Sequence, residues 1–146
     1  MSMLDSMEIS SSGLAAQRTR MKVISSNIAN VNTTRTPGGG PYRRKETIFA
    51  ALPSQKSFLK ELIDHEMDDS TRHVKVVGIT EDGRPPKLKF DPNHPDANEE
   101  GYVELPNIDI VEEVTNMMIS KRSYEANIAA INATKNMIIR SLEIGK

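Results

Sequence analysis

The feature that most constrains this chain is an apolar repeat of seven residues in each of its two end segments. In the opening segment the repeat and its helical neighbours comprise Leu4, Met7, Leu14, Met21, Ile24, Ile28 and Val31. In the closing segment they comprise Ile110, Val114, Met117, Tyr124, Ile128, Ile131, Ile138 and Leu142. A seven-residue period places apolar side chains on one narrow stripe of a helix, which is the pattern of a coiled-coil seam. We therefore expect two long helices, one at each end of the chain, that pair with each other.

The middle segment, residues 37–105, is rich in Pro and Gly and predicts a small β-rich insert. It opens with Pro-Gly-Gly-Gly-Pro, which cannot continue a helix and predicts a hinge. Strand-like runs bounded by turn residues lie at residues 43–49, 73–80, 87–90 and 102–105. Residues 54–69 fit either a short helix or a loop, and Gly145 fits a helix C-cap. The predicted fold is mainly α, with a terminal helical coiled-coil domain formed by residues 1–36 and 106–146.

The composition is thin for a self-contained core, since hydrophobic residues make up 37% of the 146 residues and aromatic residues 4%. We therefore expect part of the apolar surface to be buried against other chains. The net charge of −1, without a basic face, argues against a nucleic-acid partner. The absence of Cys excludes disulfide and thiol chemistry, and no apolar run is long enough to span a bilayer. The first residues lack a basic leader and an apolar core, so we expect no cleaved signal peptide.

Three features of the sequence suggest a metal site, a phosphate-binding loop or a catalytic triad, but each is better explained without such a site. Residues 91–100 combine Asp, His and Glu, but Pro92 and Pro95 interrupt the spacing of a calcium loop, which favours a turn-rich connector. The three consecutive glycines are not followed by the Lys-Ser/Thr pair of a phosphate-binding loop. The His residues show no spacing to Ser and Asp that would form a catalytic triad. We predict no catalytic residue, no metal site and no cofactor.

Polar side chains on the two helices admit two interpretations. Amides such as Asn27, Asn30 and Asn127 are either solvated or buried between helices, where an Asn at a core position fixes the register of the pair. Arg18 either pairs with an acidic group of a neighbouring subunit or lies on a solvated face. Tyr124 lies on the apolar stripe, so we expect its ring in the core with its hydroxyl group paired.

Two runs in the end segments resemble the signatures of flagellar rod and hook proteins. The first is Ser-Gly-Leu-Ala-Ala-Gln-Arg-Thr-Arg-Met at residues 12–21, continued at residues 24–34 by Ile-Ser-Ser-Asn-Ile-Ala-Asn-Val-Asn-Thr-Thr. The second is Ser-Tyr-Glu-Ala-Asn at residues 123–127. Residues 34–45 and 90–107 narrow the likeness to the proximal rod members of this axial family.

The resemblance implies a structural subunit that assembles into a helical tube and transmits torque. It implies a location in the periplasmic space after export, unfolded, through the flagellar type III apparatus. The implied partners are further copies of the chain, other rod proteins, and export-gate or adaptor proteins of the basal body. The predicted assembly interface comprises the two apolar stripes together with Arg18, Asn27, Asn30 and Asn127. The alternatives are a cytoplasmic coiled-coil adaptor and another rod or hook subunit.

Overall fold

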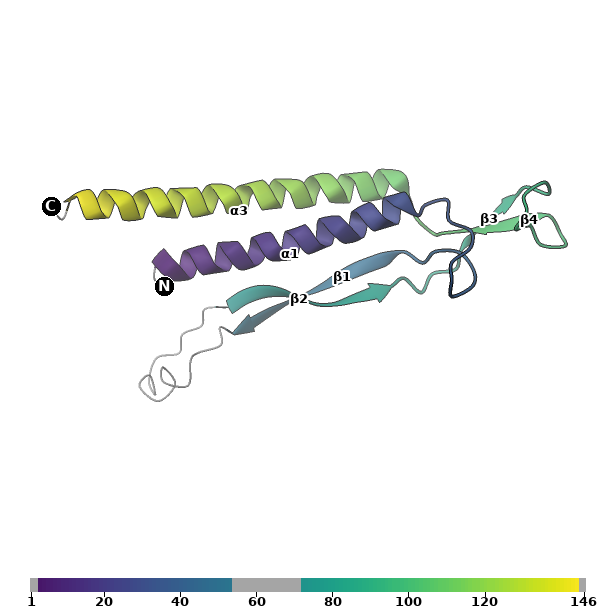
Figure 1. Ribbon diagram of the computed structural model, residues 1–146, viewed down its shortest axis with the longest axis horizontal. Coiled ribbons are helices and arrows are strands. Elements are labelled where there is room, and N and C mark those ends of the chain that lie inside the picture. Colours follow the sequence, from purple (N-terminus) through teal and green to yellow (C-terminus); the bar gives the residue numbers. More distant parts are fainter. Residues whose placement is uncertain (1–2, 54–71, 145–146) are drawn as a thin grey trace.

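A computed structural model describes residues 3–53 and 72–144 and shows two long helices with β-structure between them in sequence (Figure 1). In chain order the elements are α1 (Met3–Ala29), β1 (Lys45–Pro53), β2 (Arg72–Glu81), β3 (Lys87–Phe90), β4 (Tyr102–Leu105) and α3 (Ile110–Ile144). The predicted fold class is therefore confirmed.

The two helices lie side by side and antiparallel, with both chain termini at the same end of the pair (Figure 1). Two contacts define their register. Asn27 donates a hydrogen bond from Nδ2 to Oε2 of Glu113, at 3.0 Å. Gly13 lies so close to Asn127 that a Cβ atom on Gly13 would stand 2.9 Å from Nδ2 of Asn127. These contacts are two heptads apart on each helix, so the seven-residue period of a coiled coil holds along the seam between α1 and α3.

The start of α3 is fixed by Asp109, which lies directly before the helix. Its Oδ1 atom accepts hydrogen bonds from the backbone N–H groups of Val111, at 2.8 Å, and Glu112, at 3.3 Å. An Asp in this position satisfies backbone donors that the first turn of a helix leaves free. The C-cap predicted at Gly145 lies outside the described residues.

Within the described residues, the β-structure forms two separate two-stranded antiparallel sheets, β1–β2 and β3–β4. The β1–β2 hairpin lies along α1, whereas β3–β4 extends beyond the end of the helix pair (Figure 1). All predicted strands are confirmed, although β1 begins and ends later than the sequence pattern indicated and β2 extends beyond the predicted range at both ends. The alternatives for residues 54–69 fall on residues that the structure does not describe.

Two glycine- or proline-rich connectors are held by hydrogen bonds. In the first, the N–H of Gly39 donates to the carbonyl of Thr36 and the N–H of Thr36 donates to the carbonyl of Gly40, each at 2.9 Å. Gly39 and Gly40 have φ angles of 83° and 71°, which favour Gly. The segment predicted as a hinge is thus a hydrogen-bonded turn. The second connector, residues 91–101, is a succession of turns, which confirms that prediction.

The buried core among the described residues is small and half polar. Its apolar members are Ala16, Val23, Ile24, Val103 and Ile108. Its polar members are Asn27, Arg44, Glu113, Ser120 and Thr134. Neither described helix has a stretch long and apolar enough to cross a membrane.

Candidate assembly surface and the junction beside it

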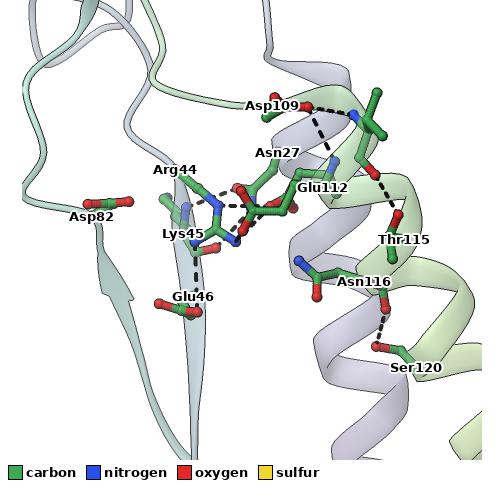
Figure 2. A network of polar contacts seen from close by, with 12 residues as sticks. Asn27, Arg44, Lys45, Glu46, Asp82, Asp109, Glu112, Thr115, Asn116 and Ser120 are labelled. Carbon is green, nitrogen blue, oxygen red and sulfur yellow. Dashed lines mark hydrogen bonds and ion pairs between the residues drawn. The ribbon is translucent and has the colours of Figure 1, made fainter.

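A buried polar junction forms where the end of α1, the start of α3 and the approach to β1 meet (Figure 2). Glu113 is 0% exposed and Arg44 is 9% exposed. The guanidinium of Arg44 donates from Nε to Oε1 of Glu113 at 2.8 Å, and its Nη2 atom lies 2.7 Å from the same oxygen. Charged hydrogen bonds of this length are stronger than neutral ones, so this ion pair fixes the approach to β1 against α3.

Asn27 joins the same junction from α1 and is 1% exposed. Its Nδ2 atom donates to the carbonyl of Lys45 at 2.8 Å and to Oε2 of Glu113 at 3.0 Å. Its Oδ1 atom accepts from the N–H of Lys45 at 2.9 Å and lies 3.2 Å from the hydroxyl of Tyr42. Two donor and two acceptor sites of the amide are thereby occupied, which is what makes its burial stable.

The electrostatics of the junction keep Arg44 charged. Burial by itself lowers the pKa of Arg44, but the hydrogen bond and the negative charge of Glu113 outweigh burial, and the net pKa is raised. Glu46 and Glu112, each 3.7 Å from the guanidinium, act in the same direction. The distance of 2.7 Å between Nη2 and Oε1 is that of an ion pair. Sequence reasoning missed Arg44 and Glu113, although Glu113 shares a seven-residue spacing with other polar residues of α3.

That spacing identifies a polar row on α3, which consists of Glu113, Ser120, Asn127 and Thr134. Ser120 and Thr134 are buried, and their hydroxyl groups donate to carbonyls of α3 itself, at 2.8 and 3.0 Å. The apolar row that sequence reasoning singled out alternates with it and is half-buried at Met117, Tyr124, Ile131 and Ile138. The prediction of a seam made of apolar stripes was therefore incomplete, because the most buried row of α3 is the polar one.

On α1, too, the predicted apolar stripe is not the most buried set of residues. Its seven-residue repeat, Met7, Leu14, Met21 and Ile28, is only half-buried. The fully buried residues are Ala16, Val23, Ile24 and Asn27, of which the stripe included Ile24 alone. At Gly13 the side chain of Asn127 fills the space that a Cβ atom would need, so the buried residues of α1 lie on rows beside the predicted stripe.

The remaining predicted residues of α3 lie outside the seam. Val114 and Ile128 are each 38% exposed and Leu142 is 68% exposed. They follow the half-buried apolar row by four residues and share one side of α3 with the exposed Met118 and Ile139. We call these five residues the outer row.

Six further predicted residues occupy other environments. Ile110 is half exposed at the start of α3, and Leu4 is mostly exposed near the start of α1. Arg18 is exposed, and Asn30 is half-buried with its Nδ2 atom donating to the carbonyl of Ser26 at 2.8 Å. Val31 and Asn127 are half-buried. The structure thus collects Ile24, Asn27 and Asn127 in or beside the seam and leaves the outer row outside it.

Comparison with known families places both helices in one class. Residues 7–35 match the family described as "Flagella basal body rod protein". Residues 99–144 match the family described as "Flagellar basal body rod FlgEFG protein C-terminal". An antiparallel pair of terminal helices that carries both signatures defines a protein of the flagellar basal-body rod class.

Full-length relatives narrow the class further. The chain is 45% identical to the flagellar basal-body rod protein FlgC of Borreliella burgdorferi, over 99% of this chain and 98% of the relative. It is 44% identical to FlgC of Bacillus subtilis and 37% identical to FlgC of Salmonella typhimurium, in each case over the full length of both chains. The chain belongs to the FlgC family of flagellar basal-body rod proteins. It is a structural rod subunit and not an enzyme, as the resemblance implied.

Proposed function

We propose that this subunit adds head-to-tail to other rod subunits through its two terminal helices, and that the outer row of α3 is one of the contact surfaces. Membership of a rod family implies assembly with flagellar rod proteins. A tube that grows without closing on itself needs different, complementary surfaces on each subunit. The outer row supplies an apolar surface that the helix pair does not use.

The observation that carries this proposal is the exposure of the outer row beside a small core. Val114, Ile128 and Leu142 remain exposed although each lies next to the half-buried apolar row. The buried apolar side chains of the described residues are fewer than the large apolar side chains left exposed. Exposed apolar side chains gathered on one side of a helix favour a protein contact, since burial of a fully exposed one contributes about 1.5–3 kcal/mol and each of these would gain the share that is still exposed.

We further propose that the subunit works in the periplasmic space, in the proximal part of the rod, after export in an unfolded state through the flagellar type III apparatus. Export-gate or adaptor proteins of the basal body are then additional partners. The small core supports this route, because a chain that buries little apolar surface by itself has little to lose when it is kept unfolded.

The test introduces two charges into the outer row, as Val114→Glu with Ile128→Glu. The matched control, Thr115→Glu with Asn136→Glu, adds the same charges to α3 at exposed polar positions. We expect both variants to keep the helix content of the parent by circular dichroism. Only the outer-row variant is expected to be missing from purified basal bodies and to abolish swimming. Incorporation of the outer-row variant at the parental level would show that this surface is not a rod contact.

A further inference from the structure

At two places in the seam between α1 and α3, a residue of one helix fits its partner on the other helix closely. The two contacts, which we call matches, differ in chemistry. At the junction, Glu113 is paired with Asn27 and Arg44. Two heptads away, Asn127 occupies the space left by the missing side chain of Gly13. The first match depends on charge and hydrogen bonding, and the second depends on size.

The alternation of rows along α3 makes some misalignments unfavourable on its own. A shift of half a heptad would bring polar row residues against apolar ones, and buried polar groups would lose their partners. A shift by a whole heptad keeps polar rows opposite polar rows, so alternation does not exclude it. Something else must select among registers that differ by seven residues.

The two matches supply that selection. After a shift of one heptad, Glu113 would lie away from Asn27, and its buried carboxylate would lose a hydrogen bond. In the same shift, Asn127 would face Arg20 or Ser6 in place of Gly13, and both of these carry the Cβ atom that Gly13 lacks. Both matches favour the same register, because they are separated by the same two heptads on each helix.

We propose that the Gly13–Asn127 contact and the Asn27–Glu113–Arg44 cluster together determine the heptad register of the helix pair. They act as positioning residues: the register sets where the outer row of α3 lies relative to the β1–β2 hairpin, which packs on α1. The inference concerns contacts within one chain and holds whichever surfaces the rod uses, so its test is independent of the proposed assembly surface.

Disulfide formation between introduced cysteines reports the register directly, because the chain itself contains no Cys. The observed register places Val23 opposite Met117, whereas shifts of one heptad place it opposite Ile110 or Tyr124. Three full-length reporters therefore combine Val23→Cys with Met117→Cys, Ile110→Cys or Tyr124→Cys. Oxidation of the purified chain is expected to cross-link the reporter with Met117→Cys and neither of the others.

Each match is then removed in all three reporters. Gly13→Leu fills the space for Asn127, and Arg44→Met with Glu113→Met replaces the ion pair by apolar side chains of similar volume, an exchange that buried pairs often tolerate. We expect each change to raise the shifted cross-links by roughly tenfold, as the loss of one matched contact predicts. Folded variants, verified by circular dichroism, that form only the cross-link between positions 23 and 117 would overturn the proposal.

A transposed variant, Gly13→Asn with Asn127→Gly, decides the case if Gly13→Leu does not fold. It keeps one Gly and one Asn in the same layer on opposite helices. The proposal requires this variant to form the cross-link between positions 23 and 117 at the parental level. A folded transposed variant with shifted cross-links would contradict size matching as the basis of the register.

Discussion

The two ends of the helix pair differ in what their side chains face. At the end where α1 finishes and α3 begins, Val23, Ile24 and Asn27 are buried and Glu113 is fully enclosed. The opposite end holds both chain termini (Figure 1). Leu4 and Leu142, near those termini, are each more than two-thirds exposed. The junction end therefore contains the buried polar interactions that a single subunit makes for itself, whereas at the terminal end the described residues leave apolar side chains largely exposed.

This difference separates two roles of the same pair of helices. Buried, hydrogen-bonded groups at the junction stabilise the subunit, because removing one leaves another without a partner in a site that excludes water. Exposed apolar groups at the terminal end contribute little to the subunit and gain free energy only when another chain covers them. Substitutions at the two ends are accordingly expected to affect different measurements.

The largest effect is expected from Glu113→Ala, because it leaves the buried Arg44 without its main partner. Breaking a buried ion pair in this way lowers the free energy of unfolding by about 3–5 kcal/mol. Glu112→Ala is the matched control, since its exposed carboxylate lies 3.7 Å from Arg44 and is worth less than about 1 kcal/mol. Chemical denaturation of the purified chains measures both. If both variants lost the same small amount of unfolding free energy, the junction would not be the end that stabilises the subunit.

A smaller loss is expected from Asn27→Ala, which leaves the N–H and carbonyl groups of Lys45 without their side-chain partner. A buried polar group that loses its hydrogen bond costs about 1–3 kcal/mol. Asn32→Ala, at an exposed Asn just after α1, is expected to stay within about 0.5 kcal/mol of the parent. If the two variants unfold at the same denaturant concentration, Asn27 does not stabilise the junction.

The smallest effect on folding is expected from Leu142→Ala at the terminal end, within about 0.5 kcal/mol, because the side chain is already exposed. Ile24→Ala, a truncation of similar size at the junction end, leaves a cavity and is expected to cost about 2–5 kcal/mol. Recovery in basal bodies is expected to fall for Leu142→Ala without loss of stability. A marked loss of subunit stability from Leu142→Ala would show that the terminal end also stabilises the subunit, contrary to the proposed difference between the two ends.

Much of the fold could be predicted because its signals are local. The seven-residue repeat predicted both helices, and alternating runs between turn residues predicted all the strands, including β3 and β4 at their observed bounds. The Pro- and Gly-rich stretches marked connectors, although the sequence did not indicate that residues 36–40 close a hydrogen-bonded turn. Periodicity and turn chemistry depend on neighbouring residues, and the sequence displays these directly.

The candidate site was predicted only in part. Ile24 belongs to the predicted stripe and is buried, whereas the buried Ala16 and Val23 lie on a different row of α1, which the heptad pattern of larger apolar residues did not indicate. For Asn27, solvation and burial were equally compatible with the sequence. Its burial depends on Lys45 and Glu113, whose positions relative to α1 no local pattern contains.

The sequence by itself determined the class of this protein and its elements: two heptad-patterned helices, four short strands, and motifs of the flagellar rod class. Tertiary structure alone decided which heptad row faces the partner helix and which remains outside. It also decided that Arg44 and Glu113, 69 residues apart, form a buried ion pair. The physical reason is that helix formation follows the spacing of side chains along the chain. Burial, by contrast, depends on which side chains of the facing elements come together, and these belong to residues far apart in the sequence, such as Gly13 and Asn127.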